Sequence, residues 1–143
     1  MAHTSSNRPA DADPTQLTAF AQEFRGALML EALVAACAVI SYADARSSLI
    51  ERWRMLEVLA EDPLLASLPK AALAEEWATH RQAFTANPAA ARDAALRQVA
   101  RLAPEPHKAR MVLDACIRIV NADQTAGSAE LQALRAIAAA LKL

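Results

Sequence analysis

Glycine is nearly absent from this chain: its 143 residues contain only two, Gly26 and Gly127. Tight β-hairpin turns need positive φ angles, which glycine adopts most easily, so a sheet built from many hairpins is disfavoured. Roughly a quarter of the residues are alanine, the strongest helix former. These features predict an all-α protein, a compact bundle of six to seven helices.

Prolines and capping residues predict where the helices begin. Asp13 and Pro14 read as an N-cap and first helical residue, with Phe20 and Phe24 behind them placed to pack on the core. A second, central helix is expected over 26–42. The remaining helices are expected to begin at Ser48, after Pro69, at Asn87-Pro88, after Pro104-Glu105-Pro106 and after Gly127.

The chain divides into a tail and one domain. Residues 1–12 are polar and lack periodicity, which predicts a disordered N-terminal tail. Residues 13–143 are expected to form a single helical domain, because 55% hydrophobic residues suffice to close a core. The longest apolar stretch, 27–43, is interrupted by Glu31 and is shorter than a membrane-spanning helix of about 20 apolar residues.

An internal repeat appears when the chain is compared with itself at an offset of 79 residues, the spacing from Cys37 to Cys116. Two related helix-loop-helix units are therefore predicted, at about 28–60 and 107–141. Both cysteines, without metal-ligand spacing, are expected to be buried free thiols, with Ile40 and Ile119 facing inward beside them. The identical pairs include Ala36, Cys37, Ile40, Ala43, Asp44 and Glu51 of the first unit.

Four acids occupy equivalent places in the two units. Each unit ends a helix in Ala-Asp and carries a Glu seven positions after the Asp: Asp44 with Glu51, and Asp123 with Glu130. If the units pack about a pseudo-two-fold axis, these carboxylates converge, and carboxylate oxygens are ligands for Ca²⁺, Mg²⁺ or Mn²⁺. The alternative is structural: the two glutamates cap helices and the two aspartates close loops through Asx turns.

At these residues the sequence resembles the TerB family of tellurite-resistance proteins, whose domain also occurs in a DnaJ-type co-chaperone. The family hallmark is a duplicated helix ending in Ala-Asp-Gly, followed by a Glu that opens another helix. Here the copies read Tyr-Ala-Asp-Ala at 42–45 with Glu51, and Asn-Ala-Asp-Gln at 121–124 with Glu130, so Ala45 and Gln124 replace the family glycines.

The resemblance covers about residues 28–141. It implies an all-α fold of about seven helices around a central helix pair, with an acidic cluster proposed in the family to hold metal ions. In function it implies a bacterial, cytoplasmic accessory protein of a stress or tellurite-resistance system that binds protein partners. A purely structural helical interaction domain without metal is the alternative.

Catalysis is not expected, and neither is a small-molecule substrate. A di-iron carboxylate bundle needs Glu-x-x-His pairs, whereas His80 follows Glu76 by four positions and His107 has no such partner. No nucleophile lies near a histidine, and no Gly-rich phosphate loop is present. His80 is expected on a solvent-exposed helix face. Trp53 and Trp77 are expected to pack in the core, with a place at an interface as the second alternative.

Charge gives little indication of a nucleic-acid or membrane partner. The net charge of −1 and pI of about 6.3 exclude the basic footprint that nucleic acid requires. The N-terminus has no secretory signal, which favours a cytoplasmic protein. Peripheral contact with the inner membrane is the lesser alternative, through a basic face that acids interrupt, made of Arg52, Arg54, Arg81, Arg92, Arg97 and Arg101.

Overall fold

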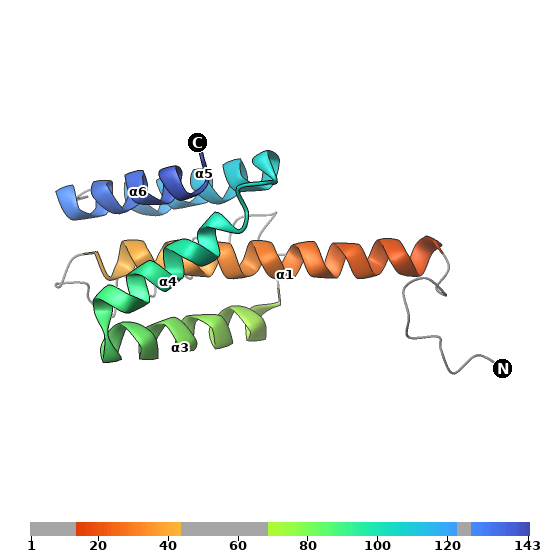
Figure 1. The fold of residues 1–143 in the computed structure, drawn as a ribbon, viewed down its shortest axis with the longest axis horizontal. Coiled ribbons are helices and arrows are strands. Elements are labelled where there is room, and N and C mark those ends of the chain that lie inside the picture. Colours follow the sequence, from red (N-terminus) through yellow and green to blue (C-terminus); the bar gives the residue numbers. More distant parts are fainter. Residues whose placement is uncertain (1–13, 44–68, 123–126) are drawn as a thin grey trace.

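A computed structural model describes residues 14–43, 69–122 and 127–143, with side chains described from Leu28 onward except Ala122. All regular structure within these ranges is helical, which confirms the all-α prediction (Figure 1). Five helices are described: α1 Pro14–Ser41, α3 Lys70–Ala86, α4 Pro88–Ala100, α5 Pro106–Ala122 and α6 Ser128–Ala140.

The first helix corrects one expectation. The separate helices predicted before and after Gly26 form a single helix, α1, of 28 residues. An isolated glycine keeps its backbone N–H and costs only about 1 kcal/mol relative to alanine, so it weakens a helix without ending it. This merger lowers the described number below the predicted six or seven. The helix predicted from Ser48 lies outside the described residues.

The central position in the bundle belongs to α1. It packs against α3, α4, α5 and α6, while α3 also contacts α4, and α6 contacts both α4 and α5. Figure 1 shows α3 on one side of α1 and the α5–α6 pair on the other, with α4 crossing α1 diagonally between them. The N-terminal half of α1 extends past these helices (Figure 1). The expected core packing of Phe20 and Phe24 falls among side chains that are not described.

The core is built around the second half of α1. Every residue from Ala32 to Ile40 is at most 6% exposed. Four of the nine are alanines, whose small side chains let neighbouring helices approach from several directions. Burial of apolar surface at about 25 cal/mol per Å² is therefore concentrated on this segment. No helix in the described ranges is both long and apolar enough to cross a bilayer.

Several predicted boundaries are confirmed. Asn87 is the N-cap of α4, where its side chain accepts a 3.2 Å hydrogen bond from the Ala90 N–H, and Pro88 is the first helical residue. Pro106 begins α5, and Gly127 is the N-cap of α6 with an extended backbone. Pro69 precedes α3 as expected.

Candidate functional site

Three of the four predicted carboxylates, Asp44, Glu51 and Asp123, lie outside the described residues. The fourth, Glu130, is half-buried in the first turn of α6. It is the third residue after the Gly127 cap, the position from which a Glu side chain can reach back to the N-cap backbone N–H. A negative charge there also interacts favourably with the helix dipole.

The helix ends that lead to the two Ala-Asp pairs are described. Figure 1 shows that α1 and α5 run in the same direction and end at the same end of the bundle. After α1, the chain turns through Tyr42, whose N–H donates to the Ala38 carbonyl at 3.0 Å, and Ala43, whose N–H donates to the Ile40 carbonyl at 3.3 Å. The α6 helix, with Glu130, begins at this same end.

Aromatic stacking anchors the end of α1. Tyr42, two positions before Asp44, stacks on Phe84 of α3 with ring centroids 4.6 Å apart and planes 12° apart. Trp77 of α3 also stacks on Tyr42, with ring centroids 6.4 Å apart and planes 27° apart. Such pairs contribute roughly 0.5–1.5 kcal/mol each beyond buried area. Trp77 packs against the core, as expected of it, whereas Trp53 lies outside the described residues.

The two repeat units both bury their equivalent cysteines. Cys37 of α1 and Cys116 of α5 are fully buried in the same hydrophobic core. The neighbouring Cys116 thiol, together with burial, raises the pKa of Cys37 well above its ordinary value. Ile40 and Ile119 are buried beside them, so the predicted inward face is confirmed.

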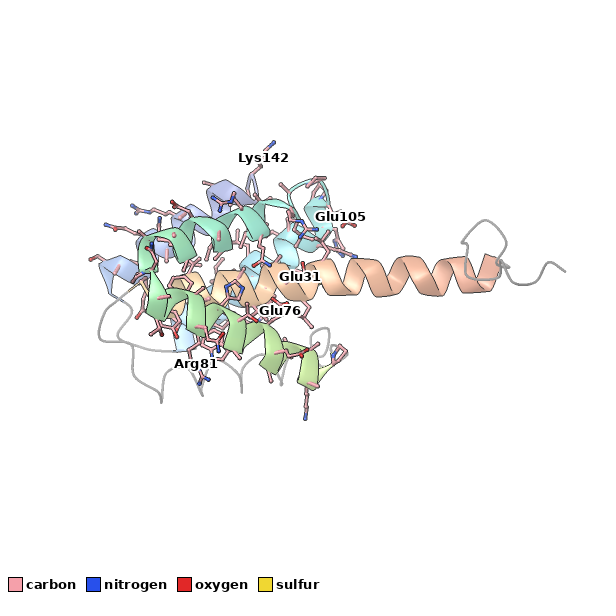
Figure 2. All side chains as sticks on the ribbon, turned by 60° about the horizontal axis from the view of Figure 1, so that its bottom comes forward. Glu31, Glu76, Arg81, Glu105 and Lys142 are labelled. Atoms are coloured by element: carbon pink, nitrogen blue, oxygen red, sulfur yellow. The ribbon has the colours of Figure 1, made fainter. Side chains whose placement is uncertain are left out.

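A cluster of charged side chains that was not predicted from the sequence lies where α1, α3 and α4 meet. The Arg101 guanidinium, at the C-cap of α4, forms an ion pair with the Glu31 carboxylate, with 3.4 Å between nitrogen and oxygen. Figure 2 shows Glu31 beside Glu76 of α3, whereas Arg81 lies on the outer side of that helix. Partial burial raises the pKa of Glu76, and the charges of Glu31 and Glu75 add to the effect.

The sequence did contain one signal for this group. Glu31 is the only charge in the apolar stretch 27–43, and a lone charge in such a run needs a partner. Its partner, however, is 70 positions away in the chain. Across the described residues, no set of three or more His, Cys, Asp or Glu side chains is arranged to hold a metal ion.

The expected solvation of His80 is wrong. The residue is 7% exposed, on the face of α3 that also carries Trp77 and Phe84, three positions before it and four after it. Burial lowers the pKa of His80, and a side-chain hydrogen bond with Gln98 of α4 opposes that shift. Its Nε2 atom has no hydrogen-bond partner among the described residues. Burial therefore favours the neutral form of the His80 imidazole.

The expected basic face is divided. Arg81 and the α4 residues Arg92 and Arg97 are exposed, whereas Arg101 forms an ion pair with Glu31. The acidic Asp93 lies next to Arg92 on the exposed part of α4. Arg52 and Arg54 belong to the undescribed residues. The described arginines therefore share their surface with acids, as predicted.

A comparison with known protein families identifies the family of this chain. The model of the family described as "Tellurite resistance protein TerB" matches residues 30–143, most of the chain. Comparisons with curated proteins and with solved structures give no match. The match includes all of α3 to α6 and the buried half of α1. On this extent of agreement, the chain belongs to the TerB family.

Proposed function

We propose that this protein is a cytoplasmic accessory protein of a stress or tellurite (metal-oxyanion) resistance system, in which it acts as a protein-interaction module. In this proposal a divalent cation binds to Asp44, Glu51, Asp123 and Glu130. The observation that carries it is the placement of the two repeat helices, since α1 and α5 contact each other and end at the same end of the bundle.

The chemistry of the cation site follows from charge. Four carboxylates brought together repel one another and destabilise the empty protein, and a divalent cation relieves that repulsion by giving the oxygens a shared partner. The stacking of Tyr42 on Phe84 supports the proposal because it holds the chain two residues before Asp44 against α3. A held ligand loses less conformational entropy on binding.

Thermal unfolding with Ca²⁺, Mg²⁺ or Mn²⁺ tests the site. Binding to the folded state stabilises the protein by about 2.7 kcal/mol at a concentration of 100 times Kd, so Tm should rise with at least one cation. The rise should vanish in the double variant Asp44→Asn with Asp123→Asn. It should persist in Asp93→Asn, a control that removes an exposed acid from α4. Unchanged Tm with all three cations and no heat of binding in calorimetry would overturn the proposal.

A structural role for the same acids is the second candidate, favoured by the position of Glu130 in the first turn after Gly127. In that case Glu130→Gln should cost at most about 1 kcal/mol, because glutamine serves equally in a capping box. If Glu130 is instead a cation ligand, Glu130→Gln should strongly weaken cation binding, because the substitution removes a charged ligand. The same titration of Glu130→Gln with each cation therefore separates the two roles.

The interaction part of the proposal is supported by exposed apolar side chains. Ile117 of α5 is 36% exposed and Leu131 of α6 is 46% exposed. Crosslinking in cells should capture a protein partner on the parent protein. The double variant Ile117→Asp with Leu131→Asp should lose that crosslink while its circular dichroism spectrum stays the same as that of the parent. Retained crosslinks would argue against this surface. Binding of the parent protein to anionic lipid vesicles would instead favour the membrane alternative.

A further inference from the structure

The outer surface of the α5–α6 pair carries two exposed apolar side chains at the same height. Ile117 lies five positions before the end of α5, and Leu131 lies three positions after the start of α6. The helices contact each other, and α5 ends where α6 begins (Figure 1). At about 1.5 Å per residue, the two side chains therefore lie within one helical turn of each other along the pair.

Exposed cations accompany these apolar side chains. Arg118 directly follows Ile117, and Arg135 lies one helical turn after Leu131. Lys142, which follows α6, points away from the bundle (Figure 2). Across the described residues, neither Arg135 nor Lys142 has an ion-pair partner. The positive charge of this surface is thus available to a binding partner.

The acids of the two helices do not balance these cations. Asp114 of α5 forms its 3.2 Å ion pair with Arg110, and Glu130, the acid of α6, is half-buried in the first turn. The whole chain has a net charge of −1, so an excess of cations here sets this surface apart from the rest of the molecule. Charge complementarity therefore indicates an acidic partner.

We propose that the α5–α6 surface binds an acidic amphipathic helix of another protein, which rests on the protein-interaction role proposed for the chain. Such a helix binds through apolar residues on one of its faces. Arg135 and Lys142 follow Leu131 by four and eleven positions, which is about 6 and 16 Å along α6. A helix lying alongside α6 meets them with acids four and eleven positions from the apolar residue that covers Leu131.

The observations favour this partner over two others. A second copy of the chain, bound through the same surface, would bring cations against cations. An anionic membrane would bring Asp114 against lipid phosphates. The exposed large apolar side chains of the described residues, Ile117, Leu131 and Leu143, also lack the Trp and Tyr that are enriched at membrane interfaces.

A photo-crosslinking amino acid at Gln132, an exposed position beside Leu131, tests the proposal in cells. Mass spectrometry should identify a segment of another protein with net negative charge and with acids four and eleven positions from an apolar residue. The matched control is Gln82, exposed on α3 on the opposite side of α1. Crosslinks from Gln132 to a second copy, to lipid or to a segment without excess acid would overturn the proposal.

The control position also separates this inference from the function on which it rests. Protein crosslinks from Gln82 with none from Gln132 would refute binding at the α5–α6 surface and leave the interaction role standing. Absence of protein crosslinks from both positions would refute both proposals.

A synthetic peptide of the captured segment measures the contribution of charge. Arg135→Glu should weaken its binding to the full chain roughly tenfold, whereas Arg81→Glu, the same change on the outer side of α3, should leave Kd unchanged. Added salt should weaken binding to the parent protein, because it screens exposed charges. The salt series keeps the test decisive even if Arg135→Glu folds poorly. Equal binding by Arg135→Glu and parent, or binding indifferent to salt, would overturn the proposal.

Discussion

The two helices that share the internal repeat differ in their exposure to solvent. Val39 of α1 is 1% exposed, whereas its equivalent on α5, Arg118, is exposed. In the same way Ala38 is fully buried and its equivalent Ile117 is 36% exposed. The cause is position: α1 packs against all four other described helices, whereas α5 packs on α1 and α6.

The identical residues of the repeat explain what the two helices still share. Cys37 and Cys116 are buried in both copies, and so are Ile40 and Ile119. These positions lie on the faces by which α1 and α5 meet the core. At three positions where the copies differ, α1 has the small or apolar residues Ala35, Ala38 and Val39, and α5 has Asp114, Ile117 and Arg118. The duplicated pattern thus preserves one face of a helix, and the neighbours of each copy select the residues on the other faces.

The largest expected effect comes from giving α1 the charge that α5 carries. Val39→Arg places a cation among fully buried side chains, with an expected loss of about 3–5 kcal/mol in unfolding free energy. The reciprocal change, Arg118→Val, should cost no more than about 1 kcal/mol because the site is exposed. Urea unfolding followed by circular dichroism measures both. Similar losses from the two variants would contradict the difference in burial.

A smaller effect is expected from exchanging sizes at the neighbouring position. Ala38→Ile inserts methylene groups into a filled core and should cost about 1–3 kcal/mol. Ile117→Ala should cost about 1 kcal/mol or less, since part of that side chain is already in water. Comparison of the two denaturation midpoints tests whether α1 is closely surrounded at this point. A neutral Ala38→Ile would reveal unfilled space there.

The α3 side of α1 should respond to acid through His80. Burial lowers the pKa of this residue in the folded state, so the unfolded chain binds a proton first as pH falls below the ordinary value of 6.5. The stabilisation is complete above that pH and is lost progressively as pH falls toward the lowered folded-state pKa. Unfolding free energies at a series of pH values should show this slope, flattened in His80→Gln and retained in His107→Gln, an exposed control. An equal slope in His80→Gln would assign the acid sensitivity elsewhere.

The smallest effect is expected on the outer face of α5. Asp114, equivalent to the fully buried Ala35, forms a 3.2 Å ion pair with Arg110, and the two side chains are 44% and 62% exposed. Exposed pairs one helical turn apart contribute about 0.3–0.5 kcal/mol. Asp114→Ala should therefore change the unfolding free energy by no more than that, as thermal unfolding at low and high salt would show. A loss above 1 kcal/mol would mean that this face is covered.

Local signals predicted the fold better than long-range ones. The cap at Asn87 and the start at Pro106 depend on neighbouring residues and were predicted correctly. Gly26 does not end α1 as predicted, because one glycine costs a helix only about 1 kcal/mol relative to alanine. The burial of His80 depends on α1 and α4, which its own sequence surroundings do not specify. The convergence of Asp44, Glu51, Asp123 and Glu130 stays a prediction.

The continuity of α1 has a mechanical consequence. A helix rises about 1.5 Å per residue, so its 28 residues span roughly 42 Å, and only the second half lies within the bundle. The projecting half is thus held at one end only, by the buried segment of α1 around Leu33 and Cys37. A force applied to the N-terminal end of α1 would be transmitted to the bundle as torque, because the backbone is helical without a break from Pro14 to Ser41, Gly26 included.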